Sequence, residues 1–430
     1  MKLSKRPNAQ AGALAGNASA VGEVCVARQP IFGSVGDVVG YELLYRRTPT
    51  ATSARGKPGN FMSADAVVRA FLHIGLEQLT SGRSAHLNLT REMLLSRAYT
   101  LMPPGSVVVE LLESVEPDDA VEAECEHLVG AGYSLALDDF VWSSSHRRLL
   151  ELASIVKIDV LDQPPARLDE IAQRLAPYDV RLLAERVETG EVRALCAGMG
   201  YEMFQGHYFA RPEVVKDQPL VSDEMAIIHA MTMMRDPGAT DADAETAFTS
   251  DTGLSSKLLR MVNSAARGGR RIESLGHALQ LIGRAELSKW LALVLVSSIA
   301  ARGAVNRELL HLAVQRARLC ELLGATAGGG RDTGALFLVG LFSLLDAISG
   351  IPMPSLLESI ALATPLRQAL MERTGPYAGT LSLAEAYERG AWKQVAEGAS
   401  SSGIGAPTVG ALYIQSLAWT RERLLSLALG

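Results

Sequence analysis

The sequence of 430 residues is poor in cysteine, has no long apolar run and carries no excess of positive charge. Its four cysteines, Cys25, Cys125, Cys196 and Cys320, are scattered and form no Cys-x-x-Cys pair. This spacing argues against a disulfide framework or a zinc site and favours buried or free thiols in a reducing compartment, so we expect a cytoplasmic protein. The formal net charge of -6 gives no overall attraction to nucleic acid, which we do not expect as a partner.

No segment has the features of a membrane span or a signal peptide. The most apolar stretch, Leu291 to Ala301, is too short to cross a bilayer and lies between Lys289 and Arg302, so we expect a buried helix. Residues 1–21 begin with basic residues, but the stretch that follows them has no apolar core of the kind that signal peptides need. We therefore predict a disordered tail there and no association with a membrane.

The first half of the chain alternates between short β-branched runs and stretches with helical periodicity, such as residues 66–76. The strand-like runs are residues 24–27, 38–44, 86–89, 107–111, 133–137, 155–158, 181–184 and 203–205. Eight strands that alternate with helices predict an α/β fold, a (β/α)8 TIM-like barrel, with an open doubly wound sheet as the alternative.

The second half of the chain has a different pattern of apolar residues. The strand pattern stops around Arg211 to Pro219, and from about Leu220 onward almost every segment has helical spacing. Glycine-rich breaks at residues 328–330 and 400–405 separate these segments. We predict two domains, the barrel at residues 22–213 and an all-helical domain with a C-terminal helical extension at residues 220–430.

Polar residues stand at or just after the ends of the predicted strands. They are Glu42, Asn88, Glu113, Asp138, Asp139, Lys157, Glu185, Glu188 and Gln205. Exposure at a strand end would account for any one of these residues. The carboxyl ends of barrel strands, however, meet at one mouth. Six carboxylates gathered there would repel one another unless cations were present. Oxygen ligands of this kind suit Mg²⁺ or Mn²⁺, and two such ions support phosphodiester hydrolysis. Lys157 would orient the attacking water or neutralise developing charge.

Several short motifs occur in a characteristic order over residues 22–213. They are Arg28-Gln-Pro-Ile, Gly40-Tyr-Glu-Leu-Leu-Tyr-Arg46, Leu87-Asn-Leu-Thr, Val109-Glu-Leu-Leu-Glu-Ser114, Leu137-Asp-Asp-Phe140, Lys157-Ile-Asp159, Ala184-Glu-Arg-Val-Glu-Thr189 and Gln205-Gly-His-Tyr-Phe. This region resembles EAL domains, which hydrolyse cyclic di-GMP to the linear dinucleotide. The resemblance implies cyclic di-GMP as a ligand and two divalent metal ions as cofactors.

The resemblance also implies a role for each matching residue. The implied metal ligands are Glu42, Asn88, Glu113 and Asp138, together with Asp139, which would bridge the two ions. The implied catalytic residues are Asp139, Lys157 beside the attacking water, and Glu185, which would be the general base or a metal-linked glutamate supported by Glu188. Gln29, Arg46 and Gln205 would contact the dinucleotide or hold the site together. A planar guanidinium such as that of Arg46 suits a phosphate because it can make two charge-assisted hydrogen bonds.

Three features depart from active members of the family. Leu43 stands in place of the alanine of the name motif, and Arg186 replaces a glycine, so that its side chain either enters the mouth or pairs with a neighbouring carboxylate. Residues 141–148 are shorter than the usual loop and lack its two glycines, whose backbone freedom Val141 and Trp142 cannot supply. Weak turnover and binding without turnover both stay open, and the altered loop puts the homodimer typical of relatives in question.

The helical half resembles HDOD domains in Asp251 to Ala265 and in Ile272 to Gly283. HDOD domains look like HD-type metal hydrolases that have lost their ligands, and here Ser343 and Leu344 stand where such a hydrolase has His-Asp. None of the eight histidines precedes an aspartate. We therefore expect a non-catalytic module that binds a signalling protein. Two hypotheses follow: a cyclic di-GMP phosphodiesterase modulated by the HDOD half, or an inactive adaptor that binds the dinucleotide or a protein.

Overall fold

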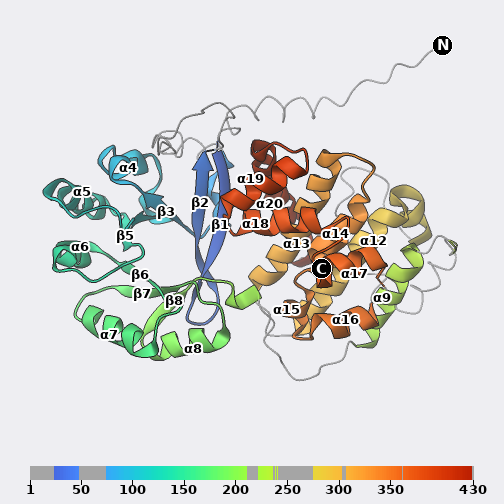
Figure 1. The fold of residues 1–430 in the computed structure, drawn as a ribbon, viewed down its shortest axis with the longest axis horizontal. Coiled ribbons are helices and arrows are strands. Elements are labelled where there is room, and N and C mark those ends of the chain that lie inside the picture. Colours follow the sequence, from blue (N-terminus) through green and yellow to red (C-terminus); the bar gives the residue numbers. More distant parts are fainter. Residues whose placement is uncertain are drawn as a thin grey trace, which may run out of the picture.

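The computed structural model describes residues 24–47, 74–210, 221–235, 238, 240, 275–302, 307–360 and 362–428. The predicted tail (residues 1–21) and the HDOD signature at Asp251 to Ala265 lie outside the described residues. Figure 1 shows a barrel beside a helical half, with the strands β1 and β2 between the two.

The first half is a closed barrel of eight strands in sequence order, as the (β/α)8 pattern predicts. The strands are β1 (Val24–Gly33), β2 (Val38–Arg47), β3 (Ser84–Leu89), β4 (Val107–Leu111), β5 (Ser134–Leu137), β6 (Ile155–Asp159), β7 (Arg181–Glu185) and β8 (Tyr201–Phe204). Each contains or overlaps one of the runs predicted from the sequence, so the predicted fold class is confirmed.

The barrel differs from eight parallel strands in one respect: β1 runs antiparallel to both of its neighbours, β2 and β8. The cause is the connection to β2, a tight turn in which Gly33 N–H donates to the carbonyl of Asp37. A connection this short can join only antiparallel strands, because a parallel crossover needs a dozen or so residues. β1 and β2 therefore form a long hairpin, which we call the hairpin below.

Short helices cover the outside of the barrel. They are α3 (Leu76–Thr80), α4 (Arg91–Leu95), α5 (Asp119–Gly130), α6 (Arg147–Leu152), α7 (Pro165–Leu175) and α8 (Gly190–Gly198). Asp118 and Thr189 cap α5 and α8, since their side chains accept hydrogen bonds from the N–H groups of Val121 and Val192.

The barrel interior has an apolar layer and a polar layer. The apolar layer consists of Ile31, Val108, Ala136, Ile155, Leu183 and Met203. Two residues further along β4, β5, β6, β7 and β8, on the same face of each strand, stand Glu110, Asp138, Lys157, Glu185 and Gln205. The apolar layer fills one end of the barrel and leaves the polar layer at the carboxyl ends of the parallel strands.

The second half is all helical in its described part. Its helices are α9 (Ser222–Arg235), α12 (Leu275–Arg302), α13 (Arg307–Ala327), α14 (Thr333–Phe342), α15 (Leu345–Ser349), α16 (Met353–Ser359), α17 (Thr364–Met371), α18 (Ala378–Glu388), α19 (Trp392–Ser401) and α20 (Ala406–Ala428). The apolar stretch at Leu291 to Ala301 is a mostly buried part of α12, as predicted. Helices α13 and α14 pack closely at Gly340, where a Cβ atom would lie 2.7 Å from the Cα atom of Ala317. Within the described part of the chain, every helix is too short or too polar to cross a bilayer.

Candidate functional site

The polar layer is built around the ammonium group of Lys157, whose side chain is fully buried. Its Nζ atom lies 2.6 Å from Asp138 Oδ1, 2.9 Å from Glu110 Oε2, 3.0 Å from Glu185 Oε1 and 3.4 Å from Glu42 Oε2. We call these five residues the Lys157 cluster. Each carboxylate comes from within or directly after a different strand, namely β2, β4, β5 and β7, so the closed barrel brings the cluster together.

Amide side chains extend the cluster on its β1 and β3 sides. Asn88 Nδ2 donates to Glu42 Oε1 over 2.7 Å, and Gln205 Nε2 donates to Glu42 Oε2 over 2.6 Å. Gln205 Nε2 also lies 3.0 Å from Gln29 Oε1, which accepts a second hydrogen bond. The sequence predictions for Gln29, Glu42, Asn88 and Gln205 thus meet in one network.

The carboxylates differ in pKa because they share one cation. Burial raises the pKa of Glu110 and Glu185 well above the ordinary value, and Lys157 opposes that rise only in part. Burial also raises the pKa of Asp138. At Glu42 burial is outweighed by Lys157 and by the hydrogen bonds from Gln205 and Asn88, which leaves its pKa below the ordinary value.

His86 supports the cluster from the neighbouring strand β3. Its Nδ1 atom lies 2.9 Å from Glu110 Oε1, and both side chains are buried. Burial, followed by the positive charge of Lys157, lowers the pKa of His86 to about 3. The imidazole is therefore neutral at ordinary pH and orients Glu110 without adding charge.

The chemistry of this layer fits divalent metal. Four carboxylates surround one ammonium group, and the buried oxygens Asn88 Oδ1 and Gln205 Oε1 accept no hydrogen bond from any described residue. Such hard oxygen donors suit Mg²⁺ or Mn²⁺. No three acidic, histidine or cysteine side chains of the described residues are arranged as a ready ligand set, because the carboxylates close on Lys157 instead. Metal binding would require them to turn away from the ammonium group.

The structure places Glu110, rather than the predicted Glu113, in the polar layer. Glu110 is fully buried on β4, whereas Glu113 lies exposed beyond the end of that strand. The alternation of side chains along a strand is the signal that identifies Glu110. It pairs directly with Asn88 in the β3–β4 register, and the two side chains share one face of the sheet. Counting polar residues at strand ends misses a site residue that lies one position inside the strand.

Asp139, Glu188 and Arg46 lie around the cluster rather than in it. Asp139 is exposed and has a positive φ of 45°, while its neighbours Asp138 and Phe140 continue the ladder through their N–H groups. Its charge contributes to the raised pKa of Asp138, after burial and the charge of Glu42. Glu188 is exposed in the loop after β7, and Arg46 is half-buried near the end of β2.

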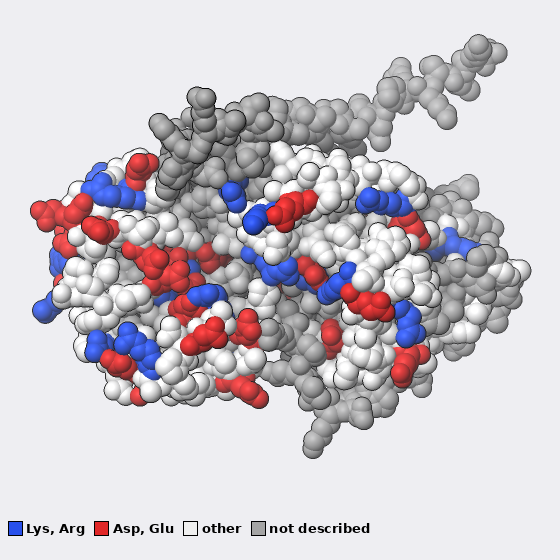
Figure 2. Space-filling model, in the orientation of Figure 1, with Lys and Arg blue, Asp and Glu red and all other residues white. Residues whose placement is uncertain are grey.

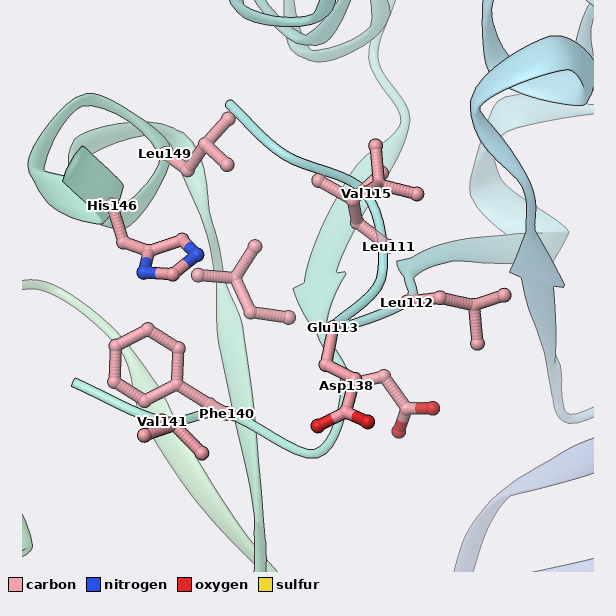
Figure 3. A pocket seen from close by; sticks show the side chains of 10 residues that line it. Leu111, Leu112, Glu113, Val115, Asp138, Phe140, Val141, His146 and Leu149 are labelled. Carbon is pink, nitrogen blue, oxygen red and sulfur yellow. The ribbon is translucent and has the colours of Figure 1, made fainter. Parts of the chain in front are cut away.

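Aromatic side chains hold the loop that lacks the family's glycines. The ring of Phe140 lies edge-on to Trp142 and to His146, with centroids 6.4 and 5.5 Å apart, and Trp142 also contacts Tyr178. Beside this loop is a small, mainly apolar pocket, in which the carboxylates of Asp138 and Glu113 lie together at one end (Figure 3). The loop is thus packed on its own aromatic residues.

Arg186 adopts one of the two arrangements expected from the sequence. Its φ of 53° lies in the left-handed region that glycine adopts most readily. The exposed guanidinium forms an ion pair with Asp159, which stands opposite Glu185 in the β6–β7 register. Arg186 therefore pairs with a neighbouring carboxylate at the rim of the mouth.

In the helical half, a buried arginine contacts Ser343, which stands where the sequence resemblance gives an HD-type hydrolase a metal-binding histidine. Arg316 Nη1 donates to Ser343 Oγ over 2.9 Å, and Arg316 Nη2 donates to Glu388 Oε2 over 2.6 Å. All three side chains are largely buried. A buried guanidinium ion pair therefore lies beside Ser343.

Comparison with known proteins agrees with this architecture. The EAL domain model matches residues 15–212 and the HDOD domain model matches residues 220–358. The chain belongs to the family of proteins that join an EAL domain to an HDOD domain. Its relatives include the cyclic di-GMP phosphodiesterase CdgJ of Vibrio cholerae, 33% identical over 408 residues, which are 92% of each chain. The uncharacterized protein YuxH of Bacillus subtilis is 29% identical over 381 residues, 87% of this chain and 93% of YuxH.

Solved EAL structures also resemble the barrel. A standalone EAL protein from Vibrio cholerae O395, in its c-di-GMP-bound form, is 24% identical, with a TM-score of 0.34, over 44% of this chain and 92% of that one. The manganese and cyclic di-GMP complex of Klebsiella pneumoniae BlrP1 is 21% identical, with a TM-score of 0.35, over 43% of this chain and 54% of that one.

Proposed function

We propose that the barrel binds cyclic di-GMP together with divalent metal and hydrolyses one of its phosphodiester bonds. The observation that carries this proposal is the Lys157 cluster, in which four largely buried carboxylates surround a single cation. Support comes from the relative CdgJ, which is named as a cyclic di-GMP phosphodiesterase.

The metal ligands would be Glu42, Asn88, Glu110 and Asp138, with Asp139 serving a second ion. Glu110 takes the place that the sequence resemblance gives to Glu113, because only Glu110 lies in the polar layer. When bound, Mg²⁺ or Mn²⁺ would acidify water and neutralise charge on the phosphate.

The protein's own residues would supply proton transfer and positioning. The carboxylate of Glu185 takes a proton from water, the water oxygen bonds to phosphorus, and the bond from phosphorus to a ribose 3′-oxygen breaks. The released 3′-oxygen takes up the proton that Glu185 removed from water, which restores the carboxylate and gives the linear dinucleotide pGpG. Lys157 faces the charge that develops on the phosphate, and Gln29 and Arg46 hold the dinucleotide, with Glu188 orienting Glu185.

The test is incubation of the full chain with cyclic di-GMP and Mn²⁺ or Mg²⁺, with chromatographic detection of pGpG. We expect Glu110→Gln to lower turnover by at least 100-fold, on the order of the loss seen when a catalytic contact is removed. The matched variant Glu113→Gln should retain activity within about 3-fold, a change of less than 1 kcal/mol in the barrier. Equal losses in both variants, or no turnover with either metal, would contradict the proposal.

The rebuilt loop favours a second candidate function, an adaptor that binds cyclic di-GMP without hydrolysing it. Residues 141–146 carry an aromatic cluster in place of the glycines with which relatives couple ligand binding to catalysis. Calorimetric binding of cyclic di-GMP in the presence of Ca²⁺, combined with no pGpG after prolonged incubation with Mn²⁺, would favour the adaptor.

We further propose that the helical half is a non-catalytic module that passes the state of the barrel to a signalling protein in the cytoplasm. The Arg316–Glu388 ion pair supports this, because it lies beside Ser343, where the sequence resemblance gives a hydrolase a metal-binding histidine. The domain limits at 22–213 and 220–430, and a homodimer through the barrel, remain proposals that light scattering of the full chain and of the two segments can test.

A further inference from the structure

The hairpin makes a buried polar contact with helix α13 of the helical half. Arg28 Nη2 of β1 lies 3.1 Å from His311 Nδ1 and 3.6 Å from Glu308 Oε1. Tyr41 of β2 donates from its hydroxyl to Glu308 Oε2 over 2.8 Å. We call these four residues the hairpin contact.

Arg28 is anchored on the barrel side as well. Its Nη1 atom donates to the carbonyl of Leu79 over 2.7 Å, and its guanidinium lies 4.3 Å from the centroid of the Tyr41 ring. The residue is only 6% exposed. A buried guanidinium with this many partners has little freedom, so the position of Glu308 constrains the position of β1.

Each of the two barrel residues in the hairpin contact directly precedes a residue of the proposed site. Arg28 is followed by Gln29, and Tyr41 is followed by Glu42. Gln29 and Glu42 are themselves paired across the β1–β2 ladder. Successive side chains of a strand point to opposite faces, so the hairpin turns one face to α13 and the other to the polar layer.

The backbone of this part of the hairpin has few ladder partners in the barrel. Among the described residues, β1 pairs with β8 through Phe32 and Gly33, and β2 pairs with β3 through Gly40 to Glu42. The stretch from Val24 to Pro30 therefore pairs with β2 alone. Beyond that ladder, its support comes from both halves. Arg28 and Gln29 bond to Leu79 and Gln205 of the barrel through their side chains. From the helical half, Tyr387 of α18 donates to the backbone carbonyl of Val26 over 3.2 Å.

A shift of the hairpin would reach the metal ligands through short hydrogen bonds. Gln205 Nε2 joins Gln29 Oε1 and Glu42 Oε2 over 3.0 and 2.6 Å, and Asn88 Nδ2 joins Glu42 over 2.7 Å. A displacement of about half an ångström would misplace Glu42 relative to the other carboxylates, which sit on separate strands.

We propose that Glu308 is a positioning residue for the metal site, through which the helical half sets the place of Glu42 and Gln29. The proposal rests on the proposed function, since it assumes that the Lys157 cluster takes up metal. A change in the position of α13 would then alter metal affinity, and metal binding would by linkage alter α13.

The test measures Mn²⁺ binding to the full chain by the electron paramagnetic resonance signal of free Mn²⁺. We expect Glu308→Ala to raise the Kd for Mn²⁺ by roughly 5- to 50-fold, the usual range of coupling between sites. Glu308→Gln keeps an acceptor for the Tyr41 hydroxyl and should recover at least part of the affinity. The matched control is Glu77→Ala, which removes an exposed ion pair between the two halves, with Arg421, and should change the Kd less than 2-fold.

The outcomes separate the two proposals. If the unaltered protein binds no Mn²⁺, the proposed function fails; if it binds Mn²⁺ and the folded Glu308→Ala variant binds equally well, only the positioning role fails. Circular dichroism checks folding. Should Glu308→Ala not fold, Tyr41→Phe removes one hydroxyl and should raise the Kd at least 2-fold, and an unchanged Kd in that variant would overturn the proposal.

Discussion

Gly206 shows how closely the loops around the mouth approach each other. It follows Gln205, and its φ of 150° brings the position of an added Cβ atom to 2.1 Å from the carbonyl oxygen of Val187. Val187 N–H in turn donates to the carbonyl of Gln205 over 2.9 Å. The glycine therefore lets the loops after β7 and β8 fix both Gln205 and Glu185.

We expect Gly206→Ala to lower the free energy of unfolding by roughly 3 kcal/mol, because the backbone must move to relieve the overlap. The matched change Gly200→Ala also has a positive φ, of 92°, but its Cβ atom would meet nothing within 4 Å. That variant should lose about 1–2 kcal/mol from backbone strain alone. Urea unfolding of both variants measures the difference, and equal losses would show that the close approach is unimportant.

At the scale of residues, the sequence predicts which types of side chain form the site better than it predicts which position supplies each one. Gln29, Glu42, Asn88, Asp138, Lys157, Glu185 and Gln205 come together as the motifs suggest. Glu110 is the exception, because it lies inside β4 rather than at its end, and its inward direction depends on the register with β3. Local sequence cannot supply a register that long-range pairing determines.

At the scale of elements, helix α13 joins the two halves through its first turn and the residues just after it. Glu308 and His311 stand one helical turn apart and both face Arg28. Because arginine can only donate, His311 Nδ1 accepts from Arg28 and the imidazole is neutral. Burial, followed by the charge of Arg28, lowers the pKa of His311 to about 3.

The low pKa of His311 predicts a loss of stability in mild acid. The unfolded chain has an imidazole pKa near the ordinary 6.5, so it binds one more proton than the folded chain between about pH 6.5 and 3. The stability that the neutral His311 contributes to the folded chain is fully present above pH 6.5 and declines as the pH falls toward 3. Relative to His311→Gln, which does not titrate, the free energy of unfolding should fall by about 1.4 kcal/mol per pH unit below pH 6.

Urea unfolding of both proteins from pH 7.5 to 5.0 measures this difference. Groups shared by the two proteins, such as His86, cancel in the comparison. Parallel stability curves over that range would contradict the assignment of a neutral His311 that accepts a hydrogen bond from Arg28.

On the scale of the whole molecule, the two halves have different surfaces but share one core. Figure 2 shows acidic side chains gathered over the middle of the barrel half and charges of both signs over the helical half. Between the halves, α20 lies so close to β1 that a Cβ atom at Gly410 would meet Tyr387 Oη at 3.1 Å and Cys25 Sγ at 3.5 Å. The sequence predicts both halves, but this packing depends on side chains more than 350 residues apart.

Forcing α20 away from β1 should uncouple the two halves. We expect Gly410→Leu to divide thermal unfolding into two calorimetric transitions, because the larger side chain cannot fit against Tyr387 and Cys25. Gly379→Leu is the matched control, since this exposed glycine of α18 has open space at its Cβ position. It should keep the unfolding profile of the unaltered protein. A single unchanged transition in Gly410→Leu would show that the contact does not couple the halves.

The hairpin also bears on how such proteins can evolve. By sequence, β1 and β2 belong to the barrel, yet Arg28 and Tyr41 find partners on α13, and Val26 on α18. A recombination event that cut the gene near residue 215 would leave these buried groups facing solvent in one product and Glu308 without its partners in the other. Barrel and helices must therefore be inherited together, and a substitution on either side of the hairpin limits which substitutions the other side can accept.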